Sequence, residues 1–158
     1  MIELLSPVGN YECLKSAIQN GADAVYFGAS SFSARAFASN FDDQNLKKAI
    51  TYAKIRGVKT NLTLNTLLKN NELSDAISIA EKAYNYGIDA IIVQDLGFAR
   101  YLIENFPGLA VHASTQLSVH NLEGVLKLQK MGFSRVVLSR ELSLKEIEFI
   151  CKNSNVEI

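Results

Sequence analysis

Short apolar runs and longer amphipathic segments alternate along the whole chain. The apolar runs have the length of β-strands and cover residues 3–5, 22–27, 58–64, 89–93, 109–113 and 135–139. In the segments that follow them, apolar residues recur at i, i+3 and i+4, the spacing that places them on one face of a helix. These predicted helices cover residues 14–21, 45–57, 73–87, 98–106, 122–132 and 144–152.

Residues typical of helix ends support these boundaries. Four predicted helices end at a glycine, which adopts the left-handed conformation that commonly follows a helix. These glycines are Gly21, Gly57, Gly87 and Gly132. The sequence S-L-K-E from Ser143 to Glu146 predicts a capping box. Asn121 and either Asp42 or Asp43 are predicted N-caps.

The alternation of strands and helices predicts an α/β fold built from parallel βαβ units. Two such folds compete. A doubly wound sheet should carry a glycine-rich phosphate loop after its first strand, but the loop here reads S-P-V-G-N. A (β/α) barrel places polar residues at the carboxyl ends of many strands, which this sequence does. We therefore predict a parallel (β/α) barrel of the TIM type.

The number of units predicts an incomplete barrel. Six strand–helix units are followed by residues 153–158, which have the pattern of the start of a seventh strand. A full barrel has about eight units and about 250 residues. We therefore expect residues 1–158 to be the N-terminal portion of a barrel domain from a longer protein. Open edge strands invite pairing with another chain, so we expect this chain by itself to form a homodimer or to swap elements.

Composition narrows the range of functions. Lys plus Arg and Asp plus Glu both number 16 and the isoelectric point is near 6.7, so the totals show no basic footprint of a nucleic-acid binder. Cys13 and Cys151 lie far apart and fit a reducing cytosol. No signal peptide or membrane-spanning run is found, so we expect a cytoplasmic protein without a membrane partner.

Polar residues at the carboxyl ends of the predicted strands form the candidate site, because these ends meet on one face of a barrel. The candidate ligand-binding residues are Arg35, Asn65, Ser114, Gln116, Ser139 and Arg140, and the candidate catalytic residues are His112, Asp95 and Glu141. Structural alternatives stay open for most of them. Asn65, Ser114 and Ser139 are also suited to capping helices or loops, Asp95 to an N-cap, and Arg140 with Glu141 to a surface ion pair.

Both histidines of the chain lie within residues 111–121. Period-two alternation puts His112, Ser114, Gln116 and Ser118 on the inward side of the strand. His120 follows the strand and precedes the predicted N-cap. This spacing is unlike that of a metal-binding histidine pair, so no metal site is predicted. We expect His112 to act on a ligand as an acid, a base or a hydrogen-bond donor, with a purely structural histidine as the alternative.

Several motifs carry a resemblance to a known family over essentially the whole chain. In order they are ELLSPVGN, NGADAVYFG, FSARAFASNF, TLNTL, VQDLG, HASTQLSVHN and LSRELSLKEI. Together they strongly resemble the N-terminal half of the collagenase-like peptidase family U-32. HASTQ and LSRELS are the most specific of these motifs.

The resemblance implies an enzyme of one of two kinds. The family carries a peptidase label without an established serine, cysteine or metal mechanism. Its bacterial members resemble enzymes of oxygen-independent hydroxylation, which act on a tRNA uridine, an rRNA cytidine or, in a related branch, the ubiquinone ring. The resemblance implies an iron–sulfur cluster held by four cysteines, and prephenate as a hydroxyl source in some members. Those cysteines begin beyond a segment like N-V-E-I, so no cofactor is expected within this chain.

Three functions therefore remain open from the sequence. The first is the N-terminal part of an RNA-base hydroxylase with tRNA or rRNA as partner. The second is a collagenase-like peptidase or peptide-binding barrel, although neither a nucleophile elbow nor an H-E-x-x-H motif is present. The third is a truncated, inactive scaffold. In the whole protein, Arg35 and Arg140 would bind an anionic ligand, while His112, Asp95 and Glu141 would transfer or orient protons.

Overall fold

The computed structural model describes residues 2–34 and 41–158. Within these residues, six parallel strands form one sheet in sequential order, β1-β2-β3-β4-β5-β6, and a helix follows each strand. The strands are β1 (Leu5–Pro7), β2 (Ala24–Gly28), β3 (Lys59–Leu64), β4 (Ala90–Val93), β5 (Ala110–Ala113) and β6 (Arg135–Val136). The helices are α1 (Tyr11–Gln19), α2 (Asp43–Lys54), α3 (Leu73–Tyr86), α4 (Leu96–Asn105), α5 (Leu122–Met131) and α6 (Leu144–Asn153).

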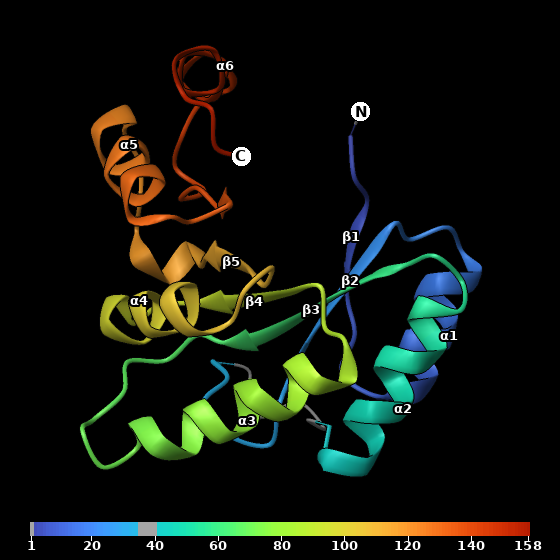
Figure 1. The fold of residues 1–158 in the computed structure, drawn as a ribbon. Coiled ribbons are helices and arrows are strands. Elements are labelled where there is room, and N and C mark those ends of the chain that lie inside the picture. The colour runs from blue at the N-terminus through green and yellow to red at the C-terminus, as the bar shows by residue number, and fades with distance from the viewer. Residues whose placement is uncertain (1, 35–40) are drawn as a thin grey trace.

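The sheet is curled, and the helices lie around its outside, which confirms the predicted α/β fold and incomplete TIM-type barrel (Figure 1). Near the C-terminus, Glu157 forms a parallel bridge with Arg135, and the Val136 amide donates to the Glu157 carbonyl at 2.8 Å. The final residues therefore begin to pair along the free edge of β6, as the pattern of a seventh strand predicts.

Strand residues divide by face, as period-two geometry requires. The side chains that point outward pack under the helices, are at most 1% exposed and are Val25, Phe27, Leu62, Leu64, Ile91, Val93, Val111 and Ala113. The alternate positions point into the barrel and carry most of its polar groups, including Asn61 and Thr63 on β3 and His112 on β5. The core therefore lies between sheet and helices, and the barrel interior is left for chemistry.

One turn recurs four times between a helix and the next strand. At each turn the predicted glycine has a positive φ, between 70° and 97°. The residue after the glycine is a buried apolar side chain whose amide donates back to a carbonyl of the preceding helix, at 3.1–3.2 Å in Ala22, Val58 and Phe133 and 3.0 Å in Ile88. This arrangement closes the helix and anchors the chain before it enters the sheet.

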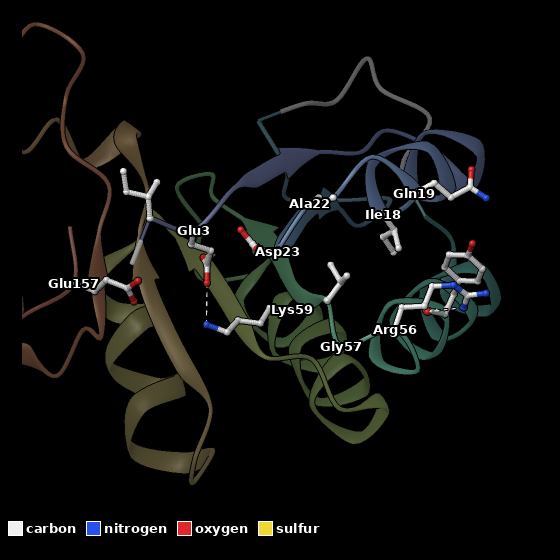
Figure 2. A pocket seen from close by; sticks show the side chains of 13 residues that line it. Glu3, Ile18, Gln19, Ala22, Asp23, Arg56, Gly57, Lys59 and Glu157 are labelled. Atoms are coloured by element: carbon white, nitrogen blue, oxygen red, sulfur yellow. Dashed lines mark hydrogen bonds and ion pairs between the residues drawn. The ribbon is translucent and has the colours of Figure 1, made fainter.

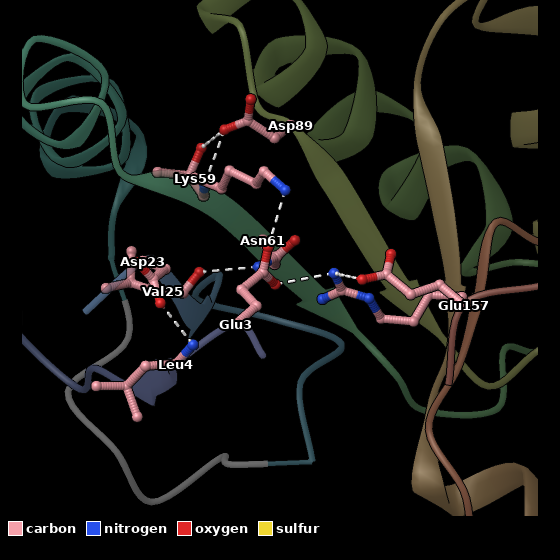
Figure 3. A network of polar contacts seen from close by, with 10 residues as sticks. Glu3, Leu4, Asp23, Val25, Lys59, Asn61, Asp89 and Glu157 are labelled. Atoms are coloured by element: carbon pink, nitrogen blue, oxygen red, sulfur yellow. Dashed lines mark hydrogen bonds and ion pairs between the residues drawn. The ribbon is translucent and has the colours of Figure 1, made fainter. Parts of the chain in front are cut away.

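Two aspartates tie neighbouring strands together just after such turns. Asp23 Oδ2 accepts a hydrogen bond from the Leu4 amide at 2.8 Å. In the same position relative to its glycine, Asp89 Oδ2 accepts from the Thr60 amide at 2.7 Å and from its hydroxyl at 2.9 Å (Figure 3). The repeated G-x-D-A sequence therefore fixes the register of each strand against the strand before it.

A charged network crosses the amino-terminal end of the barrel (Figure 3). Arg135 Nη2 on β6 lies 2.8 Å from Glu3 Oε1 and 2.6 Å from Glu157 Oε1, while Lys59 Nζ lies 2.8 Å from Glu3 Oε2. Burial by itself would raise the pKa of Glu3, but the hydrogen bonds and charges of Lys59 and Arg135 outweigh it and lower that pKa. The network joins the entry to β1 with β6 and thereby holds the curl of the sheet.

Two strand boundaries differ from the prediction. β1 covers residues 5–7 rather than 3–5, so Pro7 ends a strand instead of lying in a connection. Proline is tolerated there because β1 is an edge strand and the Val8 amide makes the next hydrogen bond, to the Tyr26 carbonyl at 3.0 Å. β6 ends at Val136 rather than Ser139, whose amide instead donates to the Val119 carbonyl at 2.9 Å.

We expect the substitution Arg135→Ala to lower the free energy of unfolding by about 2 kcal/mol or more, because it leaves Glu3 without its buried partner. The Arg135 side chain is only 11% exposed and that of Glu3 19%. Urea denaturation followed by circular dichroism measures the change. The matched control is Arg100→Ala, which removes a helix-surface ion pair with Glu104 and should change stability little. Equal effects of the two substitutions would contradict a structural role for the network.

We also expect the 158-residue chain to self-associate through its open strand edges. The outward side of β1 is unpaired in the described part of the chain, and Leu4 and Ile2 beside it are 56% and 95% exposed. Light scattering at micromolar concentration should give the mass of a dimer. A soluble monomer across this range of concentration would contradict the expectation.

Candidate functional site

A cavity of about 540 Å³ opens at the carboxyl ends of the strands, inside the curl of the sheet. Inward-pointing strand residues form its floor and walls, and residues just past the strand ends form its rim. The lining residues are Leu5, Tyr26, Ala34, Thr63, Asn65, Ile92, Ser114, Thr115, Gln116 and Val137. All of them are uncharged, and most of the polar ones carry an amide or hydroxyl group. This is the end of a parallel barrel where ligand sites are usually found.

Asn65 is held at the centre of the rim by hydrogen bonds from two directions. Its Oδ1 accepts from the Ala34 amide at 3.1 Å, and its Nδ2 donates to Ser114 Oγ at 3.2 Å. Beside it, the hydroxyls of Ser33 and Thr63 lie 3.0 Å apart. The loop after β2 is thereby attached to the end of β3, and the Asn65 amide keeps one N–H free to donate to a ligand.

Gln116 reaches the cavity from a turn rather than from a strand. β5 ends at Ala113, and Ser114 caps a short 3₁₀ helix over Thr115–Leu117, its Oγ accepting from the Gln116 amide at 3.3 Å. The predicted alternation through Ser118 is therefore wrong after Ser114, and Ser118 has φ 53°. The Gln94 side chain donates to the Gln116 carbonyl at 3.2 Å and fixes this turn. The side-chain amide of Gln116 forms no hydrogen bond to a described residue.

His112 lies one inward position below Ser114 and is buried. In the sheet register its neighbours are Ile92 on β4 and Arg135 on β6. Burial, followed by the positive charge of Arg135, lowers the pKa of His112 from 6.5 to about 4. The imidazole is therefore neutral at pH 7, and beneath the cavity it is suited to hydrogen bonding rather than to carrying charge. The predicted inward direction of His112 is confirmed.

The remaining predicted site residues lie elsewhere. Asp95 is the N-cap of α4, where Oδ1 accepts from the Phe98 amide at 2.9 Å, and its Oδ2 accepts from the Leu68 amide at 3.3 Å. Ser139 and Glu141 line a separate hollow beside His120, and Arg140 is exposed. Arg35 lies outside the described residues. Of the predicted set, the structure thus gathers Asn65, Ser114 and Gln116 around one cavity, with His112 below them.

Reasoning from strand ends missed the interior positions of the cavity. Tyr26, Thr63 and Ile92 line it from the middle of their strands. Period-two alternation counted along every strand would have found them, because Tyr26 and Thr63 occupy inward positions within otherwise apolar runs. The sequence does not show by itself which face is inward, since both faces of a barrel strand are buried.

A larger hollow of about 840 Å³ lies at the opposite, amino-terminal end of the strands (Figure 2). In the figure, Arg56 and Gln19 stand at one end, Glu157 at the other, and Glu3 with Lys59 between them. Its central charges already pair with one another across 2.8 Å. This end of a barrel contributes mainly to stability, and we assign the candidate site to the carboxyl end.

The described residues do not fit a metal or an iron–sulfur cluster. They contain no group of three or more His, Cys, Asp or Glu side chains that could hold a metal ion. A cluster of the kind implied by the family resemblance needs four cysteine thiolates, whereas Cys13 on α1 and Cys151 on α6 are both exposed and belong to different helices. No step of chemistry on this chain is therefore assigned to such a group. None of the described helices is long and apolar enough to cross a membrane.

The fold and the position of the cavity define a TIM-type barrel protein with its site at the carboxyl ends of the strands. Within that class the chain belongs to peptidase family U32, whose family model matches residues 9–158. A solved structure entitled as that of a U32 peptidase superposes with a TM-score of 0.78 at 15% identity, covering 99% of this chain and 66% of that one. This likeness supports the fold.

Three curated relatives show what named proteins the chain is similar to. It is 38% identical to the 23S rRNA 5-hydroxycytidine C2501 synthase of Escherichia coli over 99% of this chain and 23% of that protein. It is also 38% identical to the tRNA hydroxylation protein P of E. coli and to a collagenase of Porphyromonas gingivalis, each over 94% of this chain. The chain spans 33% and 35% of those two proteins, so it matches only part of each relative.

We expect His112 to make the stability of the protein depend on pH. Its pKa of about 4 lies below the value of 6.5 for an unfolded chain, so the unfolded state binds more protons between these values. The contribution to the free energy of unfolding is fully present above pH 7 and falls as the pH drops toward 4, by roughly 3 kcal/mol at most. The variant His112→Gln should lose much of this dependence in urea denaturation at a series of pH values.

The control is His120→Gln, because His120 is exposed and shares only its ring contact with the Ser118 carbonyl at 2.8 Å. This variant should keep the pH dependence of the parent protein. If His112→Gln and the parent lose the same stability between pH 7 and pH 4, the burial of His112 is not the cause.

Proposed function

We propose that this chain forms the base-binding part of an enzyme that hydroxylates a pyrimidine base of RNA. The observation that carries the proposal is the cavity at the barrel mouth, whose described lining is uncharged and combines amide groups with apolar walls. A nucleobase is flat, uncharged and rich in donors and acceptors at its edge. Asparagine and glutamine side chains are well suited to read such an edge.

The residues of the cavity have complementary roles in this proposal. The free amide of Gln116 and the remaining N–H of Asn65 face the same space and would bind the carbonyl oxygens of a pyrimidine. Leu5, Ile92 and Val137 give apolar walls, and Tyr26 adds an aromatic ring. Chemistry on a base requires that the base leave its stack and enter a pocket, for which a cavity of this kind is suited.

The names of the relatives support this substrate class. Two of the relatives are named for hydroxylation of rRNA and of tRNA, and their similarity extends over nearly the whole of this chain. In the proposal, the longer protein adds the iron–sulfur cluster and the hydroxyl source, for which prephenate is a candidate. The described residues contribute binding and orientation of the base, and His112 a neutral hydrogen-bonding group beneath it.

The competing function is that of a collagenase-like peptidase, and one relative bears the name collagenase. Ser114 and His112 share the inward face of β5 and are the nearest approach to a nucleophile and a base. However, Ser114 Oγ already accepts from Asn65 and from the Gln116 amide, and a histidine with a pKa of about 4 is a weak base. Cleavage of gelatin by highly purified protein, abolished by His112→Ala or Glu141→Gln, would favour the peptidase.

Deletion of the gene should remove one hydroxylated pyrimidine nucleoside from digested cellular RNA, as measured by mass spectrometry. A plasmid copy should restore it, and a copy with Asn65→Ala should restore about a tenth or less, because loss of a base-edge hydrogen bond costs about 1–3 kcal/mol.

The matched control is Asn105→Ala, at an exposed asparagine at the end of α4 whose side chain donates only to the Tyr101 carbonyl. This copy should restore the nucleoside fully. An RNA profile unchanged by deletion would refute the proposed function.

A further inference from the structure

The outer faces of α1 and α2 form a hollow of about 350 Å³ in which positive charge is concentrated. It is lined by Tyr11, Lys47, Lys48, Thr51, Tyr52, Ile55 and Arg56. Three of these residues are cationic, none is acidic, and Lys15 on α1 stands next to them over the ring of Tyr11. The chain as a whole has no net charge, so this groove, which we call the α1–α2 groove, is a local departure from the composition.

The cations of the groove are not neutralised by neighbours. Lys15, Lys47, Lys48 and Arg56 form no ion pair with any described residue, whereas Lys59, Lys82, Arg100, Arg135 and Lys152 all do. The nearest acidic residue on α2, Asp43, is itself engaged with Lys82 at 3.4 Å and with the Tyr86 hydroxyl at 3.1 Å. The groove therefore presents its charge to solvent.

Tyrosine rings hold these cations in place. The guanidinium of Arg56 lies 3.6 Å from the centre of the Tyr52 ring, and its Nη1 donates to the Tyr52 carbonyl at 3.0 Å. Tyr52 in turn packs edge to face against Tyr11, with ring centres 5.5 Å apart. Lys47 Nζ lies 5.6 Å from the centre of the Tyr86 ring. Side chains ordered in this way lose less entropy when they bind an anion.

The groove has the length and the position needed to follow a nucleic-acid strand. Lys48 and Arg56 are two helical turns apart on α2, which corresponds to about 12 Å at about 1.5 Å per residue. That length covers about three phosphates at roughly 3.4 Å per charge along a strand axis. Tyr11 begins α1 directly after β1, so the groove starts near the face of the barrel that carries the cavity.

We propose that the α1–α2 groove binds the phosphodiester backbone of the RNA substrate, outside the cavity that receives the base. The proposal rests on the proposed function for the identity of the substrate. Unpaired cations held on aromatic rings, with no carboxylate in the lining, are the chemistry that recognises successive phosphates. RNA is favoured over an anionic membrane because the cations line a groove between helices, in which Ile55 is the only aliphatic residue.

The test measures binding of fluorescently labelled total tRNA, and separately of an rRNA transcript, to the full chain by anisotropy at several salt concentrations. The double variant Lys47→Glu/Lys48→Glu should bind about tenfold more weakly or worse, and the slope of affinity against salt should fall by about two. Arg56→Gln should weaken binding without reversing a charge. All three side chains are exposed, and unchanged thermal unfolding would show that the variants fold.

The matched control is Lys127→Glu/Lys130→Glu, which makes the same change of charge at two exposed lysines of α5. It should bind RNA within about twofold of the parent chain. Equal losses in the two double variants would show a general charge effect and overturn the groove, as would parental affinity in the α1–α2 variants. Binding to phosphatidylserine vesicles that depends on Lys47 and Lys48, with RNA binding unchanged, would also overturn it.

The outcome is separable from that of the proposed function. A chain with Asn65→Ala should bind RNA like the parent, because the groove is intact, while failing to restore the hydroxylated nucleoside. If the groove variants lose RNA binding but deletion of the gene leaves every nucleoside unchanged, the groove stands and the hydroxylase proposal fails. If deletion removes a nucleoside but the groove variants bind RNA normally, the groove proposal alone fails.

Discussion

The side chains of a parallel strand point alternately to the two faces of the sheet, and in this chain helices cover the outer face. That constraint separates two jobs. Outward residues such as Phe27, Leu62 and Ile91 are apolar and fully buried, so they form the core. Inward residues are free of that task and can be polar. The curl of the sheet then brings the inward residues of distant strands around one space, with Arg135 and Glu3 joined across its amino-terminal end.

The interior of the barrel is therefore divided along its axis. Its amino-terminal end is filled by paired charges, among them Glu3, Lys59 and Arg135. Its carboxyl end is a cavity with an uncharged described lining, and His112 lies between the two, kept neutral by burial and by Arg135. A neutral polar cavity favours an uncharged ligand with hydrogen-bonding edges, while the cations on the outside of α1 and α2 favour a polyanion. A base within a nucleic-acid strand has both properties.

Much of this architecture could be predicted from the sequence, because local signals determine it. Hydrophobic spacing located the six helices, and the capping box at Ser143 is present with both of its hydrogen bonds. The inward direction of His112 followed from alternation. The limits of such reasoning are equally local. Asp95 has the same residue type and position whether it is catalytic or an N-cap, and only the 2.9 Å contact to the Phe98 amide shows that it caps α4. The turn after Ser114 replaced a strand because its backbone bonds are made within the turn.

The most direct test of the account observes the cavity itself. In side-chain amide NMR spectra of the chain, cytidine and uridine at millimolar concentration should shift the signals of Asn65 and Gln116 with saturation. The signals of Asn105 and Asn153, which lie on the outer helices and donate to carbonyls of their own helices, should stay in place. If Asn65 and Gln116 do not respond, or if all four signals shift alike, the cavity at the barrel mouth is not a site for a pyrimidine base.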